Sequence, residues 1–314
     1  MMKSKFFKPR RQLHLALGGG GARALAHIGV LKVIEEHNFP IMRLSGTSGG
    51  AVIAALYAQF GDIQTVEHRA RNFLLSEAFK KIGLEFFAEG QANKHNYFDS
   101  VGNFFHYLKS RLIYSRALIA ESLFPAERLI ELLSELFDEG CIEHTRIPLQ
   151  IAAVNVDTGQ DVVLDHGDLI KAVAASSAIP GIFSPVEFAG MRLIDGAVIN
   201  PVPLVRADRQ KEVVVGVDVS RCIRAAYPRR LALDYIFRAD EITLYKLNEL
   251  HLQKAEIVIR PEEVRHGHWA DFRHIDAYIH SGEKAGIAKI SELQDAMYRQ
   301  DSWFKPWLRR KFCE

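Results

Sequence analysis

The sequence predicts a three-layer α/β/α fold, in which helices cover the faces of a mainly parallel central sheet and a helical cap is inserted into the chain. Three observations support this prediction. A strand-length apolar run, a glycine-rich turn and a helical pattern follow one another twice near the N-terminus. Short apolar runs and helical patterns alternate again after residue 149. Between these two regions, residues 60–137 show helical spacing and hold ten of the 19 phenylalanines.

The first of the two N-terminal units is centred on Gly18–Gly21. Leu13–Leu17 is apolar and has the length of a strand, and apolar residues recur at helical spacing over 26–36. The same order returns with an apolar strand at Ile41–Leu44 and a turn at Gly46–Gly50, followed by a second helix. Parallel strands end at a common edge of a sheet, so we expect both glycine turns, and any ligand chemistry, at that edge.

The rest of the chain divides into an insertion, further strands and a C-terminal segment. The insertion covers about residues 60–145 and is expected to form a cap, because Tyr97–Leu112 carries apolar residues at i, i+3 and i+4. Later strands are expected at 149–154, 161–164, 192–194 and 213–217, and a short helix at 169–175. The resulting division is a basic tail at 1–12, a main domain at 13–220 and a mainly helical extension at 221–314, packed on the outside.

Composition places the chain among globular proteins. With 48% hydrophobic and 25% charged residues among 314, neither a disordered nor a fibrous protein is indicated. No apolar run is long enough to span a membrane, and no apolar signal core follows the basic N-terminus. Cys141, Cys222 and Cys313 lack CxxC spacing, which favours a reducing compartment. We therefore expect a cytoplasmic protein.

The net charge of +2 is unevenly distributed. Residues 1–12 carry five Lys or Arg and no acid, and residues 303–314 carry four Lys or Arg and one acid, which leaves the remainder at −6. A nucleic-acid binder needs a broad basic face, which this distribution does not provide. Basic ends that also carry aromatic residues suit peripheral contact with an anionic membrane, on its inner face for a cytoplasmic protein. Two solvated tails are the alternative.

Gly46-x-Ser48-x-Gly50 has the pattern of a nucleophile elbow. In such an elbow a strand turns sharply into a helix, and the glycines leave the serine hydroxyl accessible at the turn. Here the pattern lies between an apolar strand and a helix, which is the context that the mechanism requires. The helix N-terminus would stabilise negative charge developing at the serine. The alternative is a tight turn of structural origin.

The glycine run can be interpreted in two ways. Gly19-x-Gly21-x-x-Ala24 satisfies a loose dinucleotide-binding fingerprint, but the acidic residue expected about 20 positions later is missing. The other interpretation is an oxyanion hole, formed beside Ser48 by backbone N–H groups that no side chain covers. Arg23 either anchors this loop or contacts an anionic head group.

A serine nucleophile needs a base, and two candidates follow it in the chain. The histidine-rich stretch 266–280 is also compatible with metal ligation, but a solvated polar segment explains it better. His27 is expected to be packed or capping. Asp195 is the better candidate base, because it ends an apolar strand and precedes Gly196 and Ala197, which leave its carboxylate uncovered.

Together these blocks resemble the bacterial patatin-like phospholipases. The resemblance rests on the order and spacing of 15–23, 27–31, 46–50, 175–181 and 195–201, and covers roughly residues 13–220. It implies a Ser-Asp dyad without histidine, with Ser48 as nucleophile and Asp195 as base. It further implies an oxyanion hole and supporting residues, with no cofactor and no metal. The oxyanion donors would be Gly19, Gly20 and Gly21, and the supporting residues Arg23, Gly46, Gly50 and Gly196.

This resemblance implies a lipid acyl hydrolase of the phospholipase A, lysophospholipase or esterase type, acting through an acyl-Ser48 intermediate. The phenylalanine-rich cap would bind the acyl chain. Three alternatives remain open: a membrane-associated regulatory protein that keeps the fold with little turnover, an acyltransferase that uses the same acyl-serine, and a nucleotide-binding enzyme. Head group, chain length and cleavage position are not determined by these residues.

Overall fold

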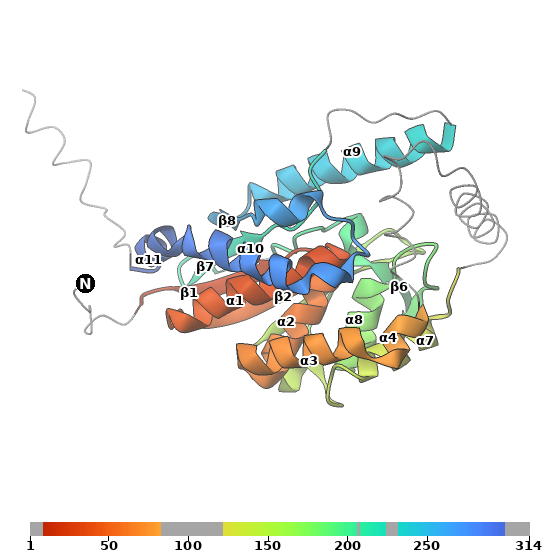
Figure 1. Cartoon of the computed structure of the whole chain (residues 1–314), viewed down its shortest axis with the longest axis horizontal. Coiled ribbons are helices and arrows are strands. Elements are labelled where there is room, and N and C mark those ends of the chain that lie inside the picture. The colour runs from red at the N-terminus through yellow and green to blue at the C-terminus, as the bar shows by residue number, and fades with distance from the viewer. Residues whose placement is uncertain (1–8, 83–121, 206–207, 224–231, 299–314) are drawn as a thin grey trace, which may run out of the picture.

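The computed structural model describes residues 9–82, 122–205, 208–223 and 232–298 (Figure 1). Its strands are β1 (Gln12–Leu17), β2 (Ile41–Thr47), β3 (Leu149–Asn155), β4 (Asp161–Leu164), β5 (Val186–Phe188), β6 (Met191–Asp195), β7 (Glu212–Val217) and β8 (Ile257–Ile259). Its α-helices are α1 (Ala26–Glu36), α2 (Gly49–Phe60), α3 (Ile63–Leu75), α4 (Glu77–Ile82), α7 (Ala126–Ser134), α8 (Leu169–Ser177), α9 (Ala232–Leu252), α10 (Ile275–Ile287) and α11 (Ile290–Tyr298). Short 3-10 helices are η1 (Gly21–Leu25), η3 (Ile142–His144), η4 (Gly196–Val198), η5 (Glu262–His266) and η6 (Phe272–His274).

The described strands form one sheet in the order β5-β6-β3-β2-β1-β7-β8, with β4 paired to β3 outside this path. Every pair from β3 through β2, β1 and β7 to β8 is parallel, whereas β4, β5 and β6 pair antiparallel. Helical connections join the parallel strands, as such pairs require. The predicted α/β fold with a mainly parallel central sheet is confirmed.

Helices cover both faces of the sheet. Leu13, Leu15 and Leu17 of β1 point into the main core with α1 and α2, and Ala16, on the opposite face, packs against Leu252 of α9. Figure 1 shows α9 at the top of the view and α3 at the bottom, with α1 and α2 between them. The alternation of β1 side chains therefore separates two packed layers.

Helix α10 packs closely on α1 through glycines. A Cβ atom built on Gly29 would lie 1.9 Å from the carbonyl oxygen of Ile279, and one built on Gly282 would lie 1.9 Å from that of Ala26. The expectation that residues 221–314 pack outside the main domain is therefore wrong: α10 shares the main core, and β8 extends the sheet beside β7. The sequence pattern does not predict β5 or β8, because three residues are too few to show an alternation.

The described part of the predicted cap is joined to the main core. Val66 and Ala70 of α3 and Leu129 and Leu133 of α7 are buried in the same cluster as α2 and α8. The stretch Tyr97–Leu112 lies outside the described residues, as do the basic ends 1–8 and 299–314. None of the helices in the described ranges is both long and apolar enough to cross a membrane.

Candidate active site

Ser48 stands at a strained turn between β2 and α2. Its backbone has φ 55° and ψ −130°, a left-handed region that residues other than glycine rarely adopt, and α2 begins at the next residue. Gly50 allows this turn to lie against β1, because a Cβ atom there would be 2.2 Å from the carbonyl oxygen of Leu17. A Cβ atom on Gly46 would likewise lie 2.5 Å from the Cα atom of Ala51. The turn has the geometry of a nucleophile elbow.

The sheet register brings Asp195 to this turn. Thr47, which precedes Ser48, pairs with Ala152 of β3, and Asp195, the last residue of β6, pairs with Ala153. Thr47 and Asp195, which are distant in the sequence, thus pair with consecutive residues of β3. Gly196 lies close against β3, because a Cβ atom built on it would be 2.4 Å from the carbonyl oxygen of Ala152. The missing side chain lets the backbone turn away directly after Asp195.

The Asp195 carboxylate is buried and bonded on both sides. Only 5% of the residue is exposed, its Oδ1 accepts the N–H of Ala197 at 2.8 Å, and it also accepts the Ser48 hydroxyl. Burial raises the pKa of Asp195 from 3.8 to about 6, although these two hydrogen bonds act to lower it. The carboxylate is therefore positioned to take a proton from Ser48, with a pKa near neutral pH.

The glycine loop after β1 presents two backbone donors beside the serine. The N–H of Gly19 donates to the carbonyl of Pro201 at 2.8 Å, so this donor is engaged. Within the described residues, the N–H groups of Gly20 and Gly21 have no hydrogen-bond partner. Gly21 has φ +56°, and a Cβ atom there would lie 2.2 Å from the carbonyl oxygen of Trp269. Only glycine fits this position of the loop.

Arg23 anchors the loop from inside the protein. Its Nε donates to the carbonyl of Val219 at 2.8 Å and its Nη1 to that of Gly267 at 3.3 Å, and the residue is 8% exposed. Burial lowers the pKa of the guanidinium to about 10, so it stays charged at neutral pH. Of the two roles expected for Arg23, the structure shows the anchor.

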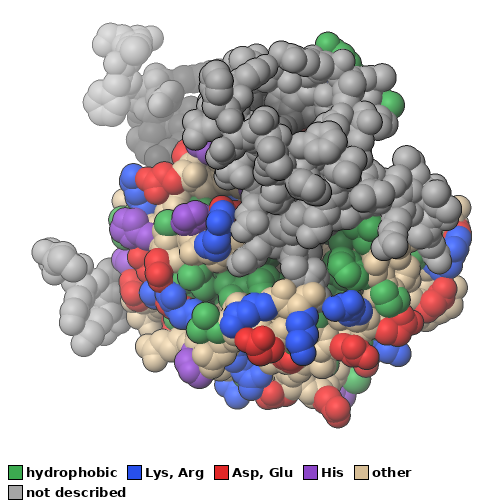
Figure 2. Space-filling view, turned by 45° about the vertical axis from the view of Figure 1, so that its right-hand side comes forward, with side chains coloured by type: hydrophobic (Ala, Val, Ile, Leu, Met, Phe, Trp, Pro, Cys, Tyr) green, Lys and Arg blue, Asp and Glu red, His purple; other side chains and the backbone are tan. Residues whose placement is uncertain are grey.

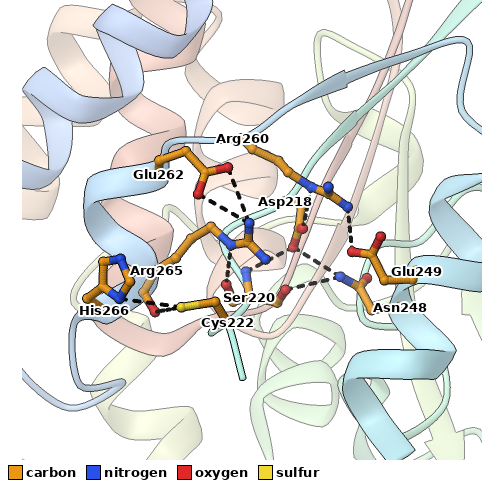
Figure 3. Close-up of polar contacts among 9 residues, drawn as sticks. All are labelled: Asp218, Ser220, Cys222, Asn248, Glu249, Arg260, Glu262, Arg265 and His266. Carbon is orange, nitrogen blue, oxygen red and sulfur yellow. Dashed lines mark hydrogen bonds and ion pairs between the residues drawn. The ribbon is translucent and has the colours of Figure 1, made fainter. Parts of the chain in front are cut away.

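A polar network holds the segment to which Arg23 is bound (Figure 3). The fully buried Asp218, at the end of β7, accepts Arg260 Nε at 3.0 Å and Asn248 Nδ2 at 3.1 Å. Arg265 Nε donates to the carbonyl of Ser220 at 3.1 Å. Because Val219 lies between Asp218 and Ser220, this network fixes the carbonyl that receives Arg23, and through it the glycine loop.

His27 is packed beneath the same loop, as expected from the sequence. Its Nε2 lies 2.8 Å from the carbonyl oxygen of Gly18, and the side chain is fully buried. Burial lowers the pKa of His27 to about 4, so the ring is neutral at physiological pH and donates Nε2–H to that carbonyl. His27 thus supports the glycine loop and has no contact with Ser48 or Asp195.

An apolar cavity of about 140 Å³ opens at Ser48. Figure 2 is turned toward the side of α4 and α7, two of the helices that line the cavity, and shows hydrophobic side chains across the middle of this face with charged side chains below them. The lining comes from η1, α2, α3, α4, α7, α8, η6 and the loops beside them. It consists of Gly21, Ala24, Leu25, Ser48, Gly49, Val52, Ile53, Leu56, Ala70, Phe73, Leu74, Phe79, Leu129, Leu132, Leu133, Leu136, Ser177, Ile179, Phe183, Trp269 and Phe272.

A family model for patatin-like phospholipases matches residues 15–208 of this chain. The chain belongs to the patatin-like phospholipase family. The matched range runs from within β1 to beyond β6 and contains the Ser48 turn and Asp195, so both residues of the candidate dyad lie within the family domain. It stops before β7, although β7, β8 and α10 complete the sheet and its covering layer.

Curated relatives in the family are longer than this chain. An uncharacterized NTE family protein of Mycobacterium tuberculosis is 27% identical over 190 residues, which cover 60% of this chain and 44% of that protein. A second one from the same organism is 26% identical over 313 residues, covering 91% and 47%. Lysophospholipase NTE1 of Eremothecium gossypii is 25% identical over 206 residues, covering 65% and 12%. The chain spans less than half the length of each of these relatives.

Among solved structures, VipD from Legionella pneumophila matches with a TM-score of 0.49 and 15% identity, covering 95% of this chain and 72% of that one.

Ser176 and Ser177 lie in the block 175–181 that carries the family resemblance, but the sequence patterns assign neither of them a role. Ser176 is fully buried, accepts the N–H of Ser48 at 2.9 Å and donates to the carbonyl of Ala152 at 2.6 Å, so it ties the elbow to β3. Ser177 follows it in the cavity wall. Both lie at the end of the alanine-rich α8, and only the packing of this helix end reveals their positions. Within the described ranges, no three or more His, Cys, Asp or Glu side chains gather as a metal site, including the described stretch 266–280.

Proposed function

We propose that this chain is a serine acyl hydrolase that cleaves carboxylic esters of lipids. The observation that carries the proposal is the hydrogen bond from the Ser48 hydroxyl to the buried Asp195 carboxylate at the end of an apolar cavity. A nucleophile paired with a base beside unengaged backbone N–H donors is the arrangement that acyl transfer needs. Membership of a phospholipase family supports a lipid ester as the substrate.

In the acylation step, Ser48 Oγ bonds to the ester carbonyl carbon while its proton passes to Asp195. The carbonyl oxygen becomes an oxyanion, which the N–H groups of Gly20 and Gly21 and the N-terminus of α2 stabilise. When this intermediate collapses, the bond from carbon to the alcohol oxygen breaks and Asp195 returns the proton to the leaving alcohol. The acyl group then remains on Ser48.

Deacylation repeats these steps with water as the nucleophile. Asp195 accepts a proton from a water molecule as its oxygen attacks the acyl carbon. Collapse of the second intermediate releases the carboxylic acid, and the proton returns from Asp195 to Ser48 Oγ. A pKa of about 6 suits this cycle, because the carboxylate is ionised at neutral pH and still basic enough to accept a proton.

In this proposal the enzyme prefers substrates with a long acyl chain, because the cavity at Ser48 is apolar. Its walls are hydrocarbon over most of their extent, and each CH₂ group transferred from water into such a site stabilises the complex by about 0.8 kcal/mol. This gain in binding free energy grows with the length of the acyl chain and does not depend on the head group, so the enzyme recognises the acyl side of its substrate.

Active-site labelling tests the proposal directly. We expect a fluorophosphonate probe to label the wild-type protein and to leave Ser48→Ala unlabelled, with turnover of palmitoyl esters lost in both Ser48→Ala and Asp195→Asn. Thr47→Ser, next to the nucleophile, is the matched control, because it keeps the hydroxyl that donates to the carbonyl of Asn200. A folded wild-type protein that neither reacts with the probe nor cleaves esters would favour the regulatory alternative. Acyl transfer to an alcohol in place of water would favour the acyltransferase.

We also propose that the basic ends bring the enzyme to anionic membranes from the cytoplasmic side. Residues 303–314 combine four basic residues with four aromatic ones and a leucine, a composition that suits an anionic lipid surface. Removing residues 303–314 should weaken binding to vesicles that contain phosphatidylglycerol, most strongly at low salt. Vesicle binding that is insensitive both to this deletion and to salt would contradict the proposal.

A further inference from the structure

The hydroxyl of Ser177 is the part of the cavity wall that the proposed mechanism leaves unused. Its Oγ is buried and has no hydrogen-bond partner among the residues that the structure describes. A serine at the end of a helix commonly bonds a nearby backbone carbonyl, and a buried hydroxyl without any partner destabilises the free protein. An unpartnered hydroxyl in a binding cavity therefore indicates that its partner arrives with the ligand.

The position of Ser177 is fixed relative to the dyad by its two sequence neighbours. Ser176, before it, accepts the backbone N–H of Ser48 at 2.9 Å. Ala178, after it, accepts the backbone N–H of Asp195 at 3.0 Å through its carbonyl. Ser177 thus lies between the residues that hold the nucleophile and the base. Ser177 lines the same cavity as Ser48.

Among the described residues, the remaining walls offer no other side-chain hydroxyl for a substrate. Apart from Ser48, Ser177 and the indole of Trp269, whose ring lies 5.6 Å from that of His268, the described lining side chains are hydrocarbon. The backbone donors of Gly20 and Gly21 are assigned to the carbonyl oxygen in the proposed mechanism. A polar atom of the substrate near the scissile ester would therefore pair with Ser177, because an unpaired polar atom in an apolar wall is unfavourable.

We propose that Ser177 is a specificity-determining residue, whose hydroxyl bonds a hydroxyl group that the substrate carries beside the scissile ester. This inference rests on the proposed function and narrows its substrate class. A serine hydroxyl donates one hydrogen bond and accepts others, so it matches another hydroxyl in both directions. Such a group has two sources, the free glycerol hydroxyl of a lysophospholipid or a β-hydroxyl on the acyl chain.

Two substrate pairs distinguish these sources. The first pair is palmitoyl lysophosphatidylcholine and its deoxy analogue without the free glycerol hydroxyl. The second is the para-nitrophenyl ester of β-hydroxypalmitate and that of palmitate. We expect kcat/KM of the wild-type enzyme to favour the hydroxylated member of one pair by about fivefold to tenfold, which corresponds to one hydrogen bond. Ser177→Ala should lose this preference between the two members of that pair.

Binding and stability provide readouts that do not need turnover. In a Ser48→Ala background, calorimetry with the same lysophospholipid pair, and with β-hydroxypalmitate and palmitate, should show the same preference and its loss in Ser177→Ala. Ser177→Ala alone should be as stable as the wild type or more stable. Ser184→Ala is the matched control: Ser184 Oγ accepts the N–H of Ala126 at 2.8 Å, so its removal should lower the melting temperature.

The two proposals fail in different ways. If the wild-type protein cleaves no ester, the proposed function fails, and the binding measurements still decide the role of Ser177. The role of Ser177 is refuted if the wild type prefers the hydroxylated member of neither pair, or if Ser177→Ala keeps the wild-type preference. It is equally refuted if Ser177→Ala loses activity on both members of a pair to the same extent. It is also refuted if Ser177→Ala is destabilised as much as Ser184→Ala, because the hydroxyl would then have a partner in the free protein.

Discussion

Replacing Asp195 with Asn separates the stability of the fold from the proposed chemistry. The carboxylate is 5% exposed, and burial raises its pKa from 3.8 to about 6. A shift of this size corresponds to about 3 kcal/mol at neutral pH, because each pKa unit is equivalent to about 1.4 kcal/mol. Asn has no charge to bury, and its Oδ1 still accepts the N–H of Ala197. We expect Asp195→Asn to raise the free energy of unfolding by up to about 3 kcal/mol at neutral pH.

The gain should depend on pH in a defined direction. The folded protein holds the Asp195 proton up to a pKa of about 6, whereas the unfolded chain releases it near 3.8. Between these values the folded state binds more protons, so ionisation of Asp195 makes the wild type progressively less stable as the pH rises. The advantage of Asp195→Asn should therefore be small near pH 4 and complete above about pH 6.5.

Activity should change in the opposite direction from stability. An amide cannot accept the Ser48 proton, so we expect kcat/KM for palmitoyl esters to fall by at least about 10³ in Asp195→Asn, the range of general-base catalysis. In the wild type, kcat/KM should rise with pH through an apparent pKa near 6 and then level, because only the ionised carboxylate is a base.

Urea unfolding at several pH values, followed by tryptophan fluorescence and paired with ester hydrolysis, measures both effects. Asp62→Asn is the control, because Asp62 caps α3 by accepting the N–H of Thr65 at 2.8 Å, its pKa is lowered, and Asn caps equally well. It should give no gain at neutral pH. An Asp195→Asn protein that is less stable than the wild type at neutral pH, or whose stability difference is the same at pH 4 and pH 7, would refute the reasoning.

Three further predictions concern the loop, the cavity and the sheet. Gly21→Ala should lower kcat by about 10² or more with the fold retained, because its Cβ displaces an oxyanion donor; unchanged kinetics would show that this N–H is not used. Leu74→Trp should narrow the cavity and lower kcat/KM for palmitoyl esters at least about tenfold relative to butyryl esters. Leu75→Trp, at the exposed neighbouring position, should leave this ratio unchanged, and the same change of the ratio in both variants would argue against the cavity as the acyl site. Burial lowers the pKa of His14 to about 4, so protonation of His14 in the unfolded chain should lower the free energy of unfolding by about 3 kcal/mol as the pH falls from 6.5 to 4. In His14→Gln the free energy of unfolding should depend less on pH over this range, and an unchanged pH dependence would exclude His14 as its cause.

Local patterns were sufficient to predict the first two strand–turn–helix units of the fold and the residues of the candidate dyad. The apolar run of β1, the glycines behind it and the helical spacing of α1 are properties of neighbouring residues, and so is the elbow around Ser48. The strand that ends at Asp195 followed by Gly196 is equally local. Such signals survive in a single sequence, because backbone conformation and side-chain alternation depend on residues a few positions apart.

Contacts between distant segments were not predictable in this way. β8 is too short to show a period, and α10 lies against α1 because Gly29 and Gly282 remove the Cβ atoms between their backbones. Sequence spacing also did not show that the Gly19 N–H is engaged, since its acceptor belongs to a residue far along the chain, Pro201.

The sequence by itself thus determined which residues are the candidates for nucleophile and base, and the strands next to which they lie. Only the tertiary structure decided that Ser48 and Asp195 meet, because their contact depends on the register of β2 and β6 along β3. It also decided that Ser177 lines the cavity and that its hydroxyl has no partner among the described residues. Register and burial arise from the packing of the whole sheet, so the raised pKa of Asp195 and the unpaired hydroxyl exist only once the core has formed around them.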